Sequence, residues 1–97
     1  MASNFGLAID RNSEGFGLKL AGDFDVTSAH ELIYAIEKLP EDTVKLYIYT
    51  NGLKTIRPIG LDIFHMFMRS LNGQSTKIVF TGRNASQLSP ANFRATA

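Results

Sequence analysis

The side chains that could do acid, base or metal chemistry in this sequence are few and far apart. The chain has two histidines, His30 and His65, and no cysteine. A metal or catalytic site needs several such groups converging at close spacing. Asp62, His65 and Arg69 are spaced three and four residues apart, which is typical of charge pairing along an exposed helix face. We therefore predict no metal site, no catalytic site, no cofactor and no enzymatic activity.

Length and charge narrow the class of protein further. The 97 residues, 44% of them apolar, suffice for one small domain with a hydrophobic core, which we expect to span residues 1–97. The formal net charge is +1 and the basic residues are scattered, whereas nucleic-acid binding needs clustered Lys and Arg. No signal-peptide pattern and no membrane-spanning apolar run is visible. We expect a cytoplasmic domain that neither binds nucleic acid nor inserts into a membrane.

The first half of the chain predicts a β-hairpin followed by a helix. Apolar and polar residues alternate over residues 5–10 and 16–20, and a cluster of turn residues separates the two runs. Ser28 and Glu31 then match a capping box, in which each side chain satisfies a free amide at a helix start. Apolar residues at helical spacing follow, and Pro40 ends the pattern. The capping box predicts that Ser28 caps the first helix.

The second half alternates strands and helices. Residues 43–50 are rich in β-branched and aromatic residues, which predicts a strand that ends at a turn over residues 51–52. A helix over about residues 58–71 follows, and residues 77–82 predict a short apolar strand covered on both faces. The remaining tail is weakly helical, and Ser89, which precedes a proline, suits a helix start.

This order of elements predicts an α/β fold. Helices that separate single strands favour parallel pairing through right-handed crossovers, and the hairpin adds one antiparallel strand. We therefore predict a small mixed sheet with an N-terminal antiparallel hairpin strand. The expected order is β-β-α-β-α-β, followed by a short helical tail.

Three stretches of the sequence resemble the STAS domain, the fold of bacterial anti-sigma factor antagonists. The stretch "LAGDFDVTSAHEL" is similar to the segment that leads into the family's first helix. The stretch "VKLYIYTNGLKTIRPIGLDIF" resembles the family's central strand and second helix start, and "TKIVFTG" resembles the next strand. The resemblance covers residues 5–93. It implies a bacterial regulatory protein in signal transduction and transcription control, whose partner is a kinase-like anti-sigma factor or another STAS protein.

The resemblance also implies where a regulatory phosphate would be attached. In phosphorylatable members, a partner kinase modifies the first serine of an Asp-Ser-Ser-Gly motif at the start of the second helix. The matching positions here are Arg57, Pro58, Ile59 and Gly60, so only the glycine agrees. Pro58 has no hydroxyl to phosphorylate, although proline suits the first turn of a helix. We expect Thr55, in the same predicted loop, to be a turn residue rather than a displaced phosphoacceptor.

Two groups of candidate site residues follow from this alignment. Partner docking is expected at the start and on the outer face of the second helix, at Arg57, Pro58, Ile59, Asp62, Met66 and Arg69. Asp25 matches a family residue that orders neighbouring loops, and capping of the first helix is a compatible interpretation. Gly60 falls in the helix's apolar arc and should allow close approach to the sheet. That predicted arc contains Leu61, Ile63, Phe64, Phe67, Met68 and Leu71.

The C-terminal part departs from the family pattern. The family usually continues into a further strand and helix, and we expect both to be absent here. The strand at residues 77–82 would then be an edge strand, which natural proteins seldom leave bare. We expect the tail or another chain to cover it, and a second copy, forming a homodimer, is one candidate. An alternative function is an anion- or nucleotide-sensing module, or a scaffold subunit of a larger signalling or transport assembly, with Arg57 supplying charge.

Overall fold

The computed structural model describes residues 4–12, 15–40, 43–71 and 77–89. These ranges contain one sheet and three helices, and the strand order in the sheet is β1-β2-β3-β4. The pair β1–β2 is antiparallel, whereas β2–β3 and β3–β4 are parallel, so the predicted mixed α/β fold is confirmed. The elements are β1 (Gly6–Asn12), β2 (Gly15–Phe24), α1 (Val26–Glu37), β3 (Lys45–Ile56), α2 (Pro58–Ser70), β4 (Lys77–Thr81) and α3 (Ala85–Leu88).

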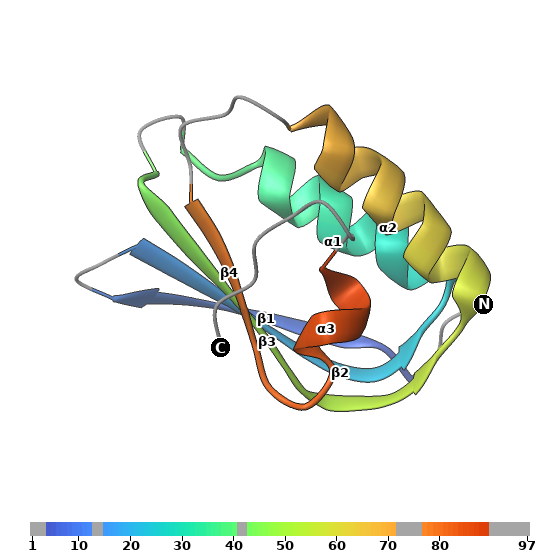
Figure 1. Cartoon of the computed structure of the whole chain (residues 1–97). Coiled ribbons are helices and arrows are strands. Elements are labelled where there is room, and N and C mark those ends of the chain that lie inside the picture. Colours follow the sequence, from blue (N-terminus) through green and yellow to red (C-terminus); the bar gives the residue numbers. More distant parts are fainter. Residues whose placement is uncertain (1–3, 13–14, 41–42, 72–76, 90–97) are drawn as a thin grey trace.

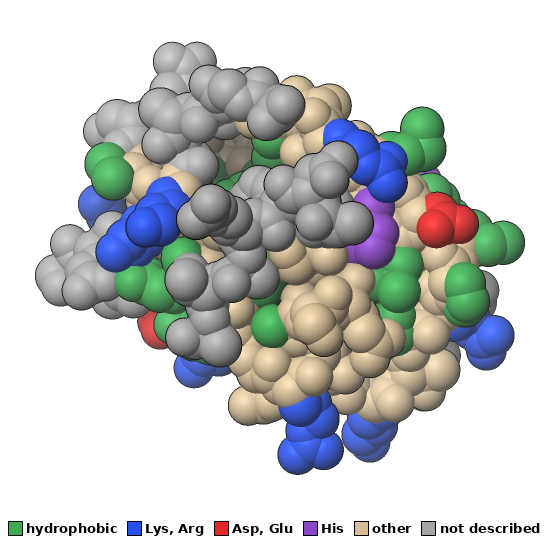
Figure 2. All heavy atoms as spheres, viewed as in Figure 1, with side chains coloured by type: hydrophobic (Ala, Val, Ile, Leu, Met, Phe, Trp, Pro, Cys, Tyr) green, Lys and Arg blue, Asp and Glu red, His purple; other side chains and the backbone are tan. Residues whose placement is uncertain are grey.

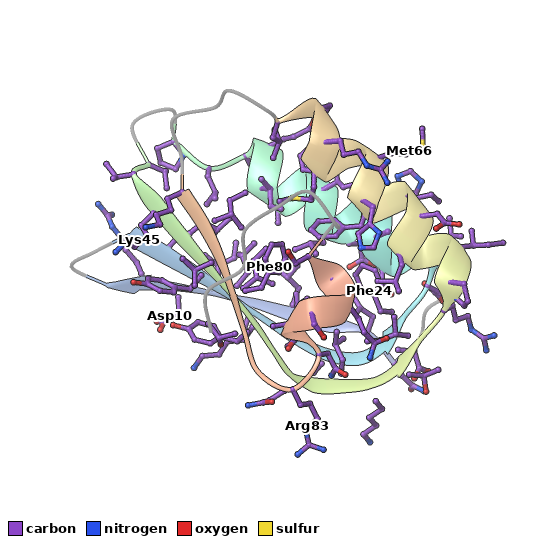
Figure 3. All side chains as sticks on the ribbon, in the orientation of Figure 1. Asp10, Phe24, Lys45, Met66, Phe80 and Arg83 are labelled. Carbon is purple, nitrogen blue, oxygen red and sulfur yellow. The ribbon has the colours of Figure 1, made fainter. Side chains whose placement is uncertain are left out.

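The long helices α1 and α2 pack side by side over one face of the sheet, and α3 contacts α2 and β4 (Figure 1). Three phenylalanines fill the space between the layers. The ring of Phe64 lies 6.1 Å from the rings of both Phe24 and Phe80, in edge-to-face geometry. Figure 3 shows Phe24 and Phe80 between the sheet and the helices. The apolar arc predicted for α2 is confirmed, because Phe64 and Met68 are buried and its other members are half-buried against the core.

Strand β3 is longer than the sequence predicts. Residues 51–52 were expected to form a turn, but they lie within β3, which runs on to Ile56. The pairing with β2 continues because two register shifts absorb the irregularity. A methyl group on Gly52 would lie 2.5 Å from the carbonyl oxygen of Leu20, so glycine is needed where the two strands approach closely. The local turn pattern was therefore overridden by pairing with β2.

The start of α1 also differs from the prediction. The helix begins at Val26, and its N-cap is Asp25 rather than Ser28. The amide of Ser28 donates a hydrogen bond to Asp25 Oδ1 at 3.0 Å, so Ser28 lies in the first helical turn. Glu31 is exposed in the following turn. The capping-box assignment was wrong because an equally good capping residue lies three positions earlier.

The C-terminal segment confirms one prediction and corrects another. Strand β4 lies at an edge of the sheet, and its three central residues are all buried. Ser89 does not start a helix, because it follows the end of α3 with extended backbone. The rest of the predicted helical tail, residues 90–97, lies outside the described residues, and so does the prediction that the tail covers the edge.

Candidate functional site

The start of α2 is built without a side-chain cap. Arg57 is the N-cap residue in extended backbone, and its side chain makes no capping hydrogen bond. Its amide donates instead to the carbonyl oxygen of Phe24 at 2.8 Å, and its carbonyl accepts from the amide of Leu61 at 3.1 Å. Pro58 follows at the first helical position, where its missing amide leaves no donor unsatisfied. The helix start is thus stable without any hydroxyl or carboxylate side chain.

Gly60 is the point where α2 meets the start of α1. A methyl group at this position would lie 2.8 Å from the carbonyl carbon and oxygen of Asp25. Backbone atoms cannot move aside as a flexible side chain would, so only glycine permits this approach. The close packing predicted for Gly60 is therefore present. Its partner, however, is the N-cap of α1 rather than a strand of the sheet.

Asp25 joins the end of β2 to the start of α1. Its Oδ1 accepts from the Ser28 amide, and Ser28 Oγ lies 3.0 Å from the same oxygen and 2.6 Å from the carbonyl oxygen of Asp23. The amide hydrogen bond from Ser28 favours the ionised carboxylate and lowers the pKa of Asp25 below its ordinary value. The capping interpretation of Asp25 is therefore confirmed, and its role in ordering neighbouring loops stays a prediction.

The six predicted docking residues are all exposed. At 3.6 residues per turn, four of them lie along one stripe of α2: Ile59, Asp62, Met66 and Arg69. The side chains of Ile59 and Met66 are 63% and 67% exposed, which is high for large apolar groups. Figure 2 shows hydrophobic side chains beside an acidic one over α2, and Figure 3 shows Met66 pointing away from the sheet. We call these four residues the outer stripe of α2, and their contact with a partner stays a prediction.

The remaining candidate residues do not form a chemical site. Thr55 is exposed in β3 opposite Asp23, so it is a strand residue and not the loop residue that was expected. His65 Nε2 lies 2.8 Å from the carbonyl oxygen of Gln87, and this contact, rather than the predicted charge pairing, is its hydrogen bond. Across the described ranges, no three His, Cys, Asp or Glu residues are placed to hold a metal ion. None of the described helices is long and apolar enough to cross a membrane.

Solved structures of known proteins share this arrangement. A STAS-domain antisigma-factor antagonist from Rhodobacter sphaeroides is 11% identical with a TM-score of 0.65, and the match covers 88% of this chain and 94% of that chain. The anti-sigma factor antagonist SpoIIAA in its unphosphorylated form is 15% identical with a TM-score of 0.57, covering 94% and 90%. This chain has the STAS fold.

A third similar structure is that of a much longer protein, Mglu. It is 14% identical with a TM-score of 0.69, and the match covers 90% of this chain. This chain spans only 20% of the length of that protein. The sequence matches no protein-family model, and no curated protein matches it. Identities this low establish a shared fold and nothing about activity.

The sequence did not predict one hydrogen-bonded corner of this fold. Thr50 Oγ1 donates to the carbonyl oxygen of Thr81 at 2.8 Å and accepts from the amide of Asn84 at 3.1 Å. The side-chain amide of Asn84 donates to the carbonyl oxygen of Thr50, and Asn51 Oδ1 accepts from the amide of Arg83. These bonds turn the chain from β4 into α3. No local pattern in the sequence indicates these bonds, because Thr50 and Asn84 lie 34 positions apart.

Proposed function

We propose that this chain is a non-enzymatic regulatory domain that acts through protein–protein contact in the cytoplasm of a bacterium. The observation that carries the proposal is the pair of exposed apolar side chains, Ile59 and Met66, on the outer stripe of α2. Ile59 lies at the helix start at which, according to the family resemblance, phosphorylatable STAS domains meet their kinase, and Met66 lies two turns further along the same stripe. We propose an anti-sigma factor or a second STAS protein as the partner.

The outer stripe has the composition of a small docking surface. Burying one Ile or Met side chain at an interface contributes about 1.5–3 kcal/mol, so two anchors can hold a transient partner. Asp62 and Arg69 lie on the same stripe, and Arg57 lies just before it. Charges around an apolar centre set orientation and exclude wrong partners more than they add affinity. The preferred partner would therefore present an apolar pocket with charges of both signs at its rim.

Docking at this surface would not be controlled by phosphorylation at the usual position. A phosphate there would be stabilised by free amides and by the helix dipole, and its charge would expel an acidic or apolar partner. Pro58 offers no hydroxyl for that reaction. Proline also removes one amide from the helix start, and the amide of Arg57 is bonded to Phe24. The same two facts make the alternative function, anion or nucleotide sensing at this helix start, the weaker proposal.

The test is affinity capture from the source organism, with bound proteins quantified by mass spectrometry. Ile59→Glu and Met66→Glu place a charge in the centre of the outer stripe and should each reduce the captured partner about ten-fold or more. Ile9→Glu is a matched control, because Ile9 is 59% exposed and lies on β1, away from α2. If the control lowers capture as much as the two α2 variants do, or if neither α2 variant lowers it, the proposed docking surface is wrong.

A further inference from the structure

Strand β3 extends well beyond the strand that pairs with it on one side. Its pairing with β2 continues to Ile56, which lies opposite Phe24. Its pairing with β4 ends at Tyr49, which lies opposite Thr81. Over residues 51–56, the side of β3 that faces away from β2 therefore pairs with no strand among the described residues. Figure 1 shows β3 continuing toward α2 after the chain has left β4 and turned back into α3.

The end of β4 explains why this edge stays open. Gly82 has a φ of 104°, a conformation that favours glycine, and it redirects the chain away from β3. A methyl group there would lie 2.7 Å from Thr50 Oγ1, so the turn is held tightly against β3. Asn51 Oδ1 then accepts from the amide of Arg83 at 2.8 Å. Helix α3 packs on α2 and β4, and the open edge begins at Gly52.

Over residues 52–56, the backbone groups that face away from β2 pair with no other strand in the part of the chain that the structure describes. The amide of Arg57 points toward β2, where it donates to the carbonyl oxygen of Phe24. Because amides alternate in direction along a strand, the amide of Ile56 points to the opposite side, toward the open edge. Gly52, Lys54 and Thr55 are exposed. A row of such groups is a template for another strand.

The charges beside this edge are positive. Lys54 and Arg57 are exposed on or just after β3, Arg83 is exposed in the turn after β4, and none of the three has an ion-pair partner among the described residues. Asp23 lies opposite Thr55 in the sheet, on the β2 side of β3. Its carboxylate accepts a hydrogen bond from Asn4. Asp25 caps α1, and Asp62 lies on the outer stripe of α2. Figure 3 shows Arg83 pointing outward beside β3, and Figure 2 shows basic side chains without acidic ones at that margin.

We propose that residues 52–56 of β3 accept an extended acidic peptide segment as an added strand. Main-chain hydrogen bonds to the edge would supply affinity, and Lys54, Arg57 and Arg83 would select aspartate and glutamate side chains. The inference goes beyond the proposed function, because it uses the backbone of β3 rather than the exposed face of α2. The competing explanation is that Lys54 and the register shifts merely protect the edge from pairing. That explanation predicts no binding of acidic strands.

Two displayed peptide libraries distinguish these explanations. Both alternate β-branched residues with charged ones, which are Asp and Glu in the first library and Lys in the second. We expect the purified protein to enrich binders from the acidic library only. The Lys54→Glu/Arg83→Glu double variant should lower affinity for an enriched peptide about ten-fold or more. Lys19→Glu, an exposed lysine on β2, should leave it within about two-fold. No enrichment of acidic over basic peptides would overturn the proposal.

Amide hydrogen exchange on the complex then locates the contact. At saturating peptide, exchange of the Ile56 amide should slow about ten-fold or more, while exchange in α1 stays unchanged. Strand addition would be overturned if the peptide slowed amide exchange only in α2. It would also be overturned if Met66→Glu lowered the affinity for the peptide while Lys54→Glu/Arg83→Glu did not. Those two results would leave the docking surface on α2 intact. Conversely, if Ile59→Glu and Met66→Glu did not lower capture of a partner, strand addition at β3 would remain possible.

Discussion

The two long helices of this domain begin next to each other, yet their first turns are built in opposite ways. Helix α1 starts at a carboxylate cap, in which Asp25 accepts hydrogen bonds from Ser28. Helix α2 starts without any side-chain cap, at an arginine followed by a proline. The two starts touch through backbone atoms, where Gly60 packs against Asp25.

This difference means that the side chains at the start of α1 hold the fold together, whereas most of those at the start of α2 do not. At the start of α1, the side chains are occupied in holding β2 to the helix, so their identities are fixed by the fold. At the start of α2, backbone bonds and the proline ring do the equivalent work. The side chains of Arg57 and Ile59 are exposed and make no capping bond, so the fold does not fix their identities. The second helix of a STAS fold can thus form without a serine at its start.

The largest loss of stability is expected on changing Phe64, whose ring packs in the core between α2 and the sheet. Phe64→Ala removes a ring that packs edge-to-face on Phe24, next to the α1 cap, and on Phe80. The free energy of unfolding should fall by about 3–5 kcal/mol, which urea denaturation would measure. Met66→Ala, two positions along on the exposed side, should change it by less than about 0.5 kcal/mol. Equal losses in the two variants would contradict the assignment of buried and exposed sides of α2.

The contact between the two starts should be the next most sensitive point. Gly60→Ala places a methyl group against the backbone of Asp25, and we expect a loss of about 1–3 kcal/mol in the free energy of unfolding. The higher helix propensity of alanine, worth about 1 kcal/mol, offsets only part of this loss. Ile59→Ala, its exposed neighbour, is the control and should be nearly neutral. A neutral or stabilising Gly60→Ala would show that the helices do not touch there.

A smaller effect should separate the capped start from the uncapped one. Asp25→Ala removes the α1 cap and should destabilise the domain at neutral pH, whereas Arg57→Ala should change little because its side chain makes no capping bond. The pKa of Asp25 is lowered in the folded state, so its contribution is complete above the ordinary value of 3.8. It is lost as the pH falls through the folded pKa.

The pH dependence has a matched control in Asp25→Asn. Asparagine also caps helices but does not titrate, so this variant should keep most of the stability at neutral pH. Its unfolding free energy should then fall less than that of the wild type on acidification below pH 3.8. Thermal unfolding of the wild type and of the Asp25 variants at neutral and acidic pH would measure both effects. Identical acid sensitivity in the wild type and Asp25→Asn would contradict the lowered pKa.

Much of the fold was predictable because each element carries its own periodicity. The order of the elements followed from alternating apolar residues in β1 and β2, apolar helical spacing in α1 and α2, and short apolar runs in β3 and β4. The errors fell where two local patterns were both acceptable. Residues 51–52 suit a turn, but β2 keeps them in the strand through two register shifts. Ser28 is a suitable N-cap residue, but α1 begins three residues earlier and Asp25 is its N-cap.

The candidate site was predictable only in part, and for a similar reason. The exposure of Ile59 and Met66 follows from helical periodicity, so the outer stripe could be placed from sequence. The corner at Thr50 and Asn84 depends on hydrogen bonds between residues 34 positions apart, which no local pattern reports. The open edge of β3 likewise appears only when the lengths of two paired strands are compared.

The most direct test of the central claim is a phosphorylation assay on the start of α2. The native protein and a variant with Arg57→Asp, Pro58→Ser and Ile59→Ser would be incubated with ATP and the cognate anti-sigma kinase. Intact-mass measurement should show one added phosphate on the variant and none on the native protein. Phosphate added in stoichiometric amount to the native chain, at Thr55 or elsewhere near the start of α2, would contradict a docking surface without a switch.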